Sequence, residues 1–302
     1  MKRRTLLGAF IATAASAALP KAANAATTTK EGTAMTNPAN RPASGYAPVN
    51  GVEVYYQIHG TGKPLVLLHG GLGAYEMFGP VLPMLTEKRM VIGIDLQGHG
   101  RTLPFDRPMT HANMATDVAG IIKWLGYDSV DIAGYSMGAE IAMRIAIDHP
   151  EVVGRLALIS AAASFSGWHE YNQQGMKSMS GALADMMKQT PMYELYAQIA
   201  PDPSLWSKSL DQMGELSRDE YDWLPELSTI KSPTIIIAGD WDAVNMAHLA
   251  AMFAQLGGGI VDAGWDGANM NANRLAIIPG ATHYSSFMDP RVFETALAFL
   301  DA

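Results

Sequence analysis

No cysteine occurs among the 302 residues of the chain. This absence excludes disulfide bonds, thiolate metal ligands and a cysteine nucleophile. An exported protein that lacks disulfides must owe its stability to its core alone. Hydrophobic residues make up 48% of the sequence, so a chain of this length can bury a large core, and we expect one domain with an insertion.

Basic residues are scarce. The 21 Lys and Arg stand against 29 Asp and Glu, which gives a formal net charge of −8. Several of the basic residues, Lys2, Arg3, Arg4 and Lys21, fall near the N-terminus, so the remainder of the chain is more acidic still. Binding to nucleic acid requires Lys and Arg clustered against phosphate. The composition therefore predicts no nucleic-acid partner.

The N-terminal apolar stretch, residues 6–19, is shorter than the roughly 20 residues that a transmembrane helix needs. It follows a basic start and precedes Ala23-Asn24-Ala25, which has the small-x-small pattern of a signal-peptide cleavage site. We therefore interpret residues 1–25 as a signal peptide that is removed, and we expect no stable membrane anchor.

The type of export signal is indicated by Arg3-Arg4-Thr5-Leu6-Leu7, which resembles the twin-arginine motif. Lys21, just before the cleavage pattern, fits the same class. These residues predict a periplasmic or secreted protein. The following residues, 26–45, are rich in Thr, Ala, Asn and Pro and are expected to form a flexible leader.

From residue 46 to the C-terminus, short apolar runs alternate with helical patterns. The expected strands are 52–58, 65–68, 91–94, 130–133, 156–159, 234–238 and 275–278. The expected helices are 75–85, 113–125, 137–149, 246–256 and 290–300. Apolar runs of this kind are typical of parallel strands that helices cover on both faces. The alternation predicts an α/β fold with a doubly wound, mostly parallel sheet.

One segment interrupts this alternation. Between residues 159 and 234 we find no convincing strand, whereas methionine and aromatic residues are frequent. We expect a helical cap over about 163–227, lying on one end of the sheet. Its methionine and aromatic side chains can form the cap's own small core or line an apolar substrate pocket, and the sequence leaves both interpretations open.

The most informative motif is Gly134-Tyr135-Ser136-Met137-Gly138, which lies between an expected strand and an expected helix. A sharp strand-to-helix turn holds such a serine in a strained conformation, and the flanking glycines let neighbouring backbone pack closely. The helix that follows offers backbone N–H groups and a positive dipole end to a developing oxyanion. Ser136 is therefore our candidate nucleophile.

A serine hydroxyl needs a base that accepts its proton near neutral pH. Of the eight histidines, His283 is best placed, because it follows the 275–278 strand in a loop just before the last helix. His69 and His99 lie in other loops at strand ends, where we expect them to hydrogen-bond loop backbone. The other histidines fall on predicted surface positions or in the insertion: His59, His111, His149, His169 and His248.

The base in turn needs a carboxylate that orients it. The 234–238 strand ends in Gly239-Asp240-Trp241-Asp242, which offers two candidates. The preceding strand, 156–159, runs into Ser160-Ala161-Ala162-Ala163 and offers no carboxylate. The residues themselves leave Asp240 and Asp242 as alternatives.

From about Gly51 to Leu300 the chain resembles the α/β-hydrolase superfamily, in the branch of small serine esterases. The resemblance rests on four motifs: His69-Gly70-Gly71, Asp95-Leu96-Gln97-Gly98-His99-Gly100-Arg101-Thr102, the Gly134–Gly138 elbow, and Gly239-x-x-Asp242 followed by Gly280-x-x-His283. The order Ser, Asp, His along the chain is also that of this family. The motifs are specific for fold and triad and only weakly specific for substrate.

The resemblance assigns further roles. The acid is the last residue of the family's Gly-x-x-Asp pattern, which favours Asp242 over Asp240. The resemblance also implies that the backbone N–H groups of Gly71 and Met137 form the oxyanion hole. The Asp95 motif braces loops in this family and is left out of the expected site.

The expected reaction is acyl transfer from a small-molecule substrate, and it requires no metal and no cofactor. The apolar cap favours a small carboxylic ester or lactone. Hydrolysis of a C–C bond, or an amidase or aminopeptidase activity, remains possible with the same triad. A non-catalytic binding module on a hydrolase scaffold is a further alternative, although such proteins usually lack one of the three triad residues and none is missing here.

Overall fold

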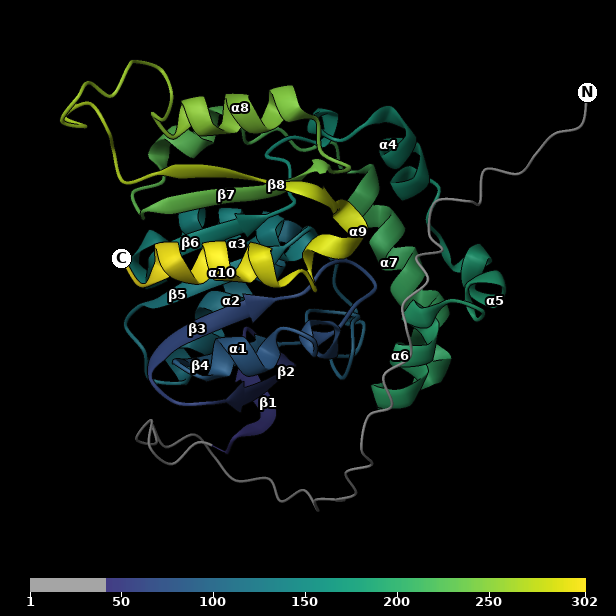
Figure 1. Cartoon of the computed structure of the whole chain (residues 1–302). Helices are drawn as coiled ribbons and strands as arrows, with labels where there is room; N and C mark the ends of the chain where they lie inside the picture. The colour runs from purple at the N-terminus through teal and green to yellow at the C-terminus, as the bar shows by residue number, and fades with distance from the viewer. Residues whose placement is uncertain (1–41) are drawn as a thin grey trace, which may run out of the picture.

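The computed structural model describes residues 42–302 (Figure 1). The predicted signal peptide, 1–25, and positions 26–41 of the predicted leader lie outside the described residues. Strand β1 (Ser44–Val49) begins within the 26–45 range and was not predicted. Its Gly and Pro residues obscured the strand pattern, since both are uncommon inside strands, and Pro48 is tolerated because β1 is an edge strand.

The centre of the molecule is an eight-stranded sheet in the order β1-β2-β4-β3-β5-β6-β7-β8. After β1, the strands are β2 (Val52–His59), β3 (Lys63–Leu68), β4 (Arg89–Ile94), β5 (Val130–Tyr135), β6 (Val153–Ile159), β7 (Thr234–Trp241) and β8 (Arg274–Thr282). The pairs β1–β2 and β2–β4 are antiparallel, and all the others are parallel. The predicted fold class is confirmed, and the parallel strands bring their carboxyl ends to one edge.

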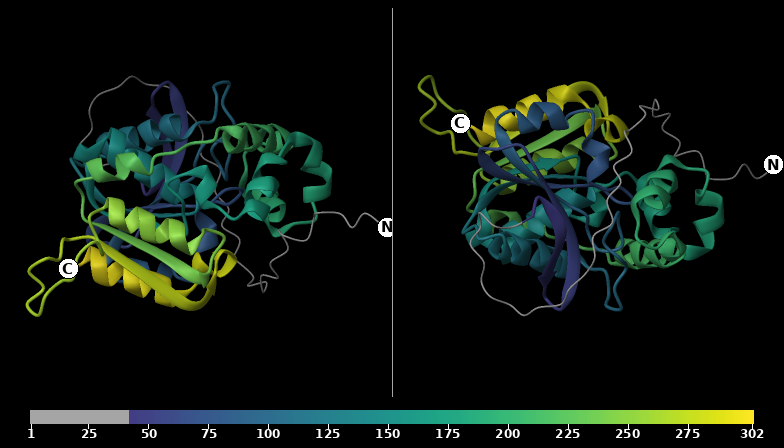
Figure 2. Two further views of the ribbon diagram at one scale, coloured as in Figure 1. Left: turned by 90° about the horizontal axis from the view of Figure 1, so that it is seen from above. Right: turned by 90° about the horizontal axis from the view of Figure 1, so that it is seen from below.

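Helices cover both faces of the sheet (Figure 2). One face packs against α2 (His111–Trp124), α3 (Met137–Asp148) and α8 (Met246–Gln255). The other packs against α1 (Leu82–Thr86) and α10 (Pro290–Leu300). None of the helices between residues 42 and 302 has the length and apolar character that crossing a bilayer requires.

The predicted helix 75–85 is wrong as a continuous element. The chain instead forms a 3₁₀ turn, η2 (Tyr75–Phe78), and then the short helix α1. Gly79 and Pro80 separate the two, and Pro80 interrupts the helix because it has no backbone N–H to donate.

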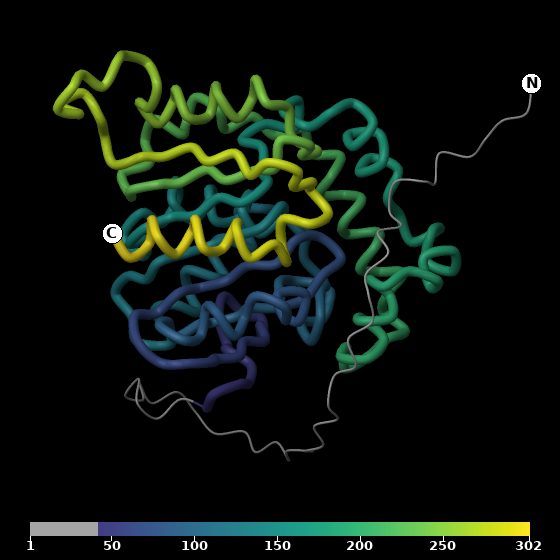
Figure 3. The backbone as a smooth tube through the Cα atoms, in the orientation of Figure 1, coloured from purple at the N-terminus to yellow at the C-terminus, as the bar shows by residue number. Residues whose placement is uncertain are grey.

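Between β6 and β7 the chain forms helices over one end of the sheet, which are most easily followed in the backbone trace of Figure 3. They are η4 (Phe165–Gly167), α4 (Glu170–Lys177), η5 (Gly181–Leu183), α5 (Ala184–Met187), α6 (Pro191–Ile199), η6 (Pro203–Leu205), α7 (Trp206–Arg218) and η7 (Pro225–Thr229). Met179, Met187, Tyr196 and Trp206 form a small core there, together with Leu72 from the loop after β3. This segment, which we call the cap, therefore packs against a loop at the carboxyl edge of the sheet.

Candidate active site

Ser136 lies at the turn between β5 and α3, with φ 53° and ψ −124°. Few residues other than glycine adopt a positive φ, because the conformation is strained. The two flanking glycines make the turn possible: a Cβ on Gly134 would lie 2.3 Å from the Gly138 carbonyl oxygen, and one on Gly138 would lie 2.4 Å from the Leu68 carbonyl oxygen. The serine therefore stands at the carboxyl edge of the sheet, with neighbouring backbone packed against its turn.

Two hydrogen bonds join the three predicted triad residues in a chain. The Ser136 Oγ lies 3.1 Å from His283 Nε2, and His283 Nδ1 lies 3.0 Å from Asp242 Oδ1. Both distances are within hydrogen-bond reach, which a nucleophile, its base and the orienting acid require. His283 does not lie in an open loop as predicted, because it is the first residue of a short helix, α9 (His283–Ser286).

The structure brings Asp242 to the histidine, and it places Asp240 elsewhere. Asp242 is buried. Asp240 is exposed, and its Oδ1 accepts a hydrogen bond from the Gly280 N–H at 2.7 Å. Of the two carboxylates that the sequence left as alternatives, Asp242 is the one that contacts His283.

Several donors surround the Asp242 carboxylate. Oδ1 also accepts a hydrogen bond from the Val244 N–H at 3.2 Å, and Oδ2 accepts one from Ser160 Oγ at 2.6 Å. Burial acts to raise the pKa of Asp242, but the hydrogen bond and charge of His283, with those from Ser160 and Val244, outweigh it and hold that pKa below its usual value. The carboxylate is thus kept ionised beside the histidine.

The predicted oxyanion-hole residues flank the serine. Met137 is the first residue of α3, so its N–H has no partner within the helix. On the other side, a Cβ on Gly70 would lie 3.3 Å from Ser136 Cβ, and Gly71 follows directly. A Cβ on Gly71 would in turn lie 3.0 Å from Cε of Met213 in the cap.

His69 braces the loop that carries Gly71. Its Nδ1 lies 2.8 Å from the Gly70 carbonyl oxygen, and its Nε2 accepts a hydrogen bond from the Leu96 N–H at 3.0 Å. Burial lowers the pKa of His69 to about 3, so the ring is neutral and Nδ1 donates. His99 likewise contacts backbone, with Nδ1 2.8 Å from the Gln97 carbonyl oxygen. The prediction that these two histidines serve loop backbone is confirmed.

A buried polar network begins beside His283. The Trp168 ring meets the His283 ring edge-on at a centroid distance of 5.3 Å, and Trp168 Nε1 donates to Tyr221 Oη at 3.1 Å. Tyr221 hydrogen-bonds Glu140 Oε1, and Glu140 Oε2 lies 3.2 Å from His111 Nε2. The interpretation of His111 as a surface residue is wrong, because this contact and the packing of aromatic rings bury it.

The sequence analysis did not place Tyr135 at the site, and it left open which of the cap's methionine and aromatic residues, Trp168 and Met213 among them, line a pocket. Tyr135 Oη donates to the His283 carbonyl oxygen at 2.6 Å and so holds the backbone of the histidine. Trp168 and Met213 reach the site from the cap. Tyr135 stands within the serine motif and could have been noticed there, whereas the cap contacts join residues far apart in the chain and leave no local signal.

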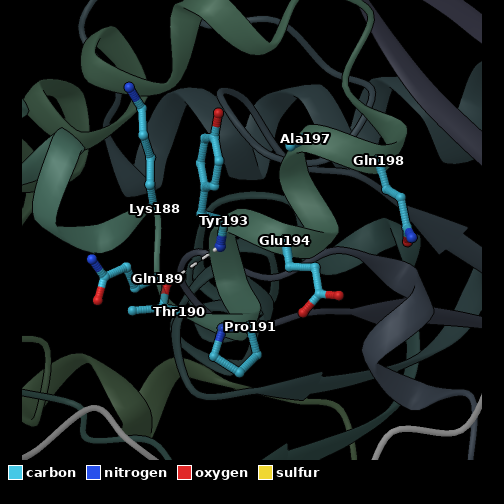
Figure 4. Close-up of a pocket in the computed structure, with 8 residues that line it drawn as sticks. All are labelled: Lys188, Gln189, Thr190, Pro191, Tyr193, Glu194, Ala197 and Gln198. Atoms are coloured by element: carbon cyan, nitrogen blue, oxygen red, sulfur yellow. Dashed lines mark hydrogen bonds between the residues drawn. The ribbon is translucent and has the colours of Figure 1, made fainter.

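Two surface hollows lie away from the triad. One, of about 570 Å³, is lined by cap residues around the start of α6, where the Tyr193 N–H donates to Thr190 Oγ1 (Figure 4). The other, of about 380 Å³, includes Lys63, Asp131 and Arg155 at the opposite edge of the sheet. In neither does a triad residue form part of the lining. Residues 42–302 also contain no cluster of three or more His, Asp or Glu side chains suited to holding a metal ion.

Fold and site together define the class: a hydrolase built on a doubly wound α/β sheet with a helical cap. Residues 63–188 match the family model described as alpha/beta hydrolase fold. The AB hydrolase superfamily protein YisY of Bacillus subtilis is 30% identical over 220 residues, which cover 64% of this chain and 79% of that protein. The chain belongs to the α/β-hydrolase superfamily.

Two further similarities extend over more of the chain. The putative carbamate hydrolase RutD of Azorhizobium caulinodans is 28% identical over 269 residues, which cover 83% of this chain and 96% of that protein. The solved structure of the enol-lactonase from Burkholderia xenovorans LB400 matches with a TM-score of 0.63 and 24% identity, covering 85% of this chain and all of that one. The second similarity concerns the fold alone.

Proposed function

We propose that the chain is a serine hydrolase that cleaves a small, largely apolar carboxylic ester or lactone through an acyl-enzyme intermediate. Ser136 is the nucleophile, His283 the base and Asp242 the acid that orients it. The observation that carries the proposal is the continuous contact from Ser136 Oγ through His283 to Asp242, at 3.1 and 3.0 Å. This geometry provides an activated hydroxyl at a strained turn.

In the first half-reaction, His283 Nε2 takes the proton of Ser136 as its Oγ attacks the substrate carbonyl carbon. The N–H groups of Gly71 and Met137 donate to the oxyanion, and each such donor contributes roughly 2.7–4 kcal/mol of transition-state stabilisation. The tetrahedral intermediate then collapses, and His283 gives its proton to the leaving alkoxide. Ser136 is left acylated.

In the second half-reaction, the same histidine takes a proton from water, and the resulting hydroxide attacks the acyl carbon. Collapse of this second intermediate releases the carboxylic acid, and the proton returns from His283 to Ser136 Oγ. With a lactone, the alcohol and the acid are parts of one product. Asp242 stays ionised and stabilises the imidazolium that forms in each half-reaction.

The apolar side chains around the triad support a small, uncharged substrate. Trp168 and Tyr284 meet the His283 ring edge-on, and Met213 closes over Gly71. An uncharged ester or lactone is compatible with such walls, because it loses little hydration on entering them. A methionine wall is also adaptable, since its side chain has three rotatable bonds.

A chain-length series tests this substrate class. Among p-nitrophenyl esters of increasing acyl length, we expect the short esters to give the highest kcat/KM, and lactones to be cleaved while aminoacyl anilides are not. Met213→Ala should favour longer acyl chains by about 10-fold relative to wild type, because each methylene accommodated by a pocket is worth about 10–200-fold. Met186→Ala, at an exposed cap position, is the matched control and should leave the profile unchanged. Faster cleavage of the anilides than of any ester or lactone would contradict the proposed class.

We propose in addition that residues 1–25 direct the enzyme out of the cytoplasm by twin-arginine-type export. The support is Arg3-Arg4 before an apolar stretch and a cleavage pattern. In the full chain, replacing both arginines with lysine should leave precursor in the cytoplasm, as measured by cell fractionation and immunoblotting. Equal amounts of mature protein outside the cytoplasm for both chains would argue for a different export signal.

A further inference from the structure

Ser160 is a second serine at the carboxyl edge of the sheet. It follows directly after β6, the neighbour of the strand that leads to Ser136. Its exposed fraction is 0%, so it cannot reach a substrate. Any part that Ser160 plays in the reaction must therefore pass through another residue.

That residue is Asp242. Ser160 Oγ donates to Asp242 Oδ2 at 2.6 Å, while Oδ1 faces His283 Nδ1 at 3.0 Å. The side-chain partners are thus divided between the two oxygens, the serine on Oδ2 and the histidine on Oδ1, while the backbone N–H groups of Gly239 and Val244 add longer bonds of 3.4 and 3.2 Å. A hydrogen bond to an ionised acceptor is shorter and stronger than one between neutral groups, which agrees with the short distance.

The backbone of Ser160 is strained. Its φ is 54°, close to the 53° of Ser136. Four non-glycine residues in the range 42–302 have a positive φ: Asn50, Leu72, Ser136 and Ser160. Leu72, Ser136 and Ser160 all belong to loops at the edge that carries the triad, and such strain clusters at functional sites. Glycine would adopt this conformation without the steric cost but would lack a side chain. The serine therefore provides a hydroxyl at the expense of backbone strain.

We propose that Ser160 is a positioning residue of the triad: its hydroxyl fixes the Asp242 carboxylate with Oδ1 toward His283. The inference rests on the proposed function and adds a fourth side chain to its machinery. Without this hydroxyl, the carboxylate loses its shortest hydrogen bond, which favours its charged form, and only the longer bond from the Gly239 N–H still holds Oδ2.

A double-mutant cycle tests this role, because a residue that acts only through Asp242 has no effect once Asp242 no longer serves the histidine. Ser160→Ala should lower kcat/KM for p-nitrophenyl acetate about 10-fold in the wild-type background, as expected for a charge-assisted hydrogen bond. In the Asp242→Asn background the same change should cost less than about twofold. Equal losses in both backgrounds would show a general structural effect and overturn the proposal.

Two further variants separate the effect of losing the Ser160 hydroxyl from the effect of backbone strain and from that of removing any buried serine hydroxyl. Ser160→Gly removes the hydroxyl and also relieves the strain of the positive φ. It should therefore have the same reduced kcat/KM as Ser160→Ala but a higher melting temperature than that variant. A fully active Ser160→Gly enzyme would overturn the proposal. Ser232→Ala is the matched control: Ser232 is buried near the opposite end of β7 and donates to the Val153 carbonyl oxygen, so its loss should not change kcat/KM.

The outcomes distinguish this inference from the proposed function itself. If Ser136 does not react with a fluorophosphonate and Asp242→Asn is as active as wild type, the proposed function fails, and the role of Ser160 fails with it. If both of those tests give the expected results and Ser160→Ala equals wild type, only the role of Ser160 is wrong.

Discussion

Replacing Ser136 with alanine is expected to lower kcat for p-nitrophenyl acetate by about 10⁶-fold, since the loss of a triad nucleophile has an effect of this size. The reason is that the turn between β5 and α3 holds the Ser136 hydroxyl 3.1 Å from His283 Nε2, and alanine has no hydroxyl to replace it. The measurement is steady-state hydrolysis with the purified enzyme. Ser178→Ala, at an exposed serine in the cap, is the control and should retain full activity.

The same experiment extends to the base. His283→Ala should lose about as much activity as Ser136→Ala, and the double variant should lose little more, because the two residues act as a unit. Losses that instead multiply in the double variant would indicate that the two side chains work independently. Retention of more than about one tenth of wild-type activity by Ser136→Ala would contradict the assignment of the nucleophile.

The second large effect is expected for Asp242→Asn, which should lower kcat by about 10⁴-fold. An asparagine at this position keeps the shape of the side chain but presents an amide that can donate to His283 Nδ1. The ring then carries its proton on Nε2, where it can no longer accept the proton of Ser136. Steady-state kinetics measure the loss, and circular dichroism establishes that the variant is folded.

Asp240→Asn is the matched control, two residues earlier and still within β7. Asp240 accepts a hydrogen bond from the Gly280 N–H, at a distance from the base, so its replacement should lower kcat by less than about 10-fold. If Asp240→Asn were the inactive variant and Asp242→Asn the active one, the assignment of the acid would be wrong.

The fold could be predicted from the sequence because each buried strand is a short apolar run bounded by turn residues. The serine motif was also local, since Gly134, Ser136 and Gly138 stand within one strand–turn–helix unit. His283 could be placed because the carboxyl ends of parallel strands share one edge of the sheet.

The choice between the two aspartates was harder to make from the residues. In a regular strand, residues two apart point to the same side, so alternation does not separate Asp240 from Asp242. The structure separates them by a register shift in the β7–β8 pairing between Gly239 and Trp241, after which Asp242 turns inward. Only the family resemblance favoured Asp242 in advance.

Other features depend on tertiary packing and leave no pattern in the sequence. Met213 reaches Gly71, and Trp168 reaches His283, across more than a hundred positions of the chain. Ser160 was set aside because it is not a carboxylate, yet it hydrogen-bonds the carboxylate on the next strand. Its positive φ, which draws attention to it, is a property of the folded backbone.

The most direct test of the central claim is reaction with a fluorophosphonate probe, followed by mass spectrometry of the digested protein. We expect a single adduct on the peptide that contains Ser136, and much slower labelling of the His283→Ala variant, because the probe reports on a serine that its neighbouring base has activated. Absence of an adduct on the folded enzyme, or an adduct on a different serine, would contradict the claim that His283 activates Ser136.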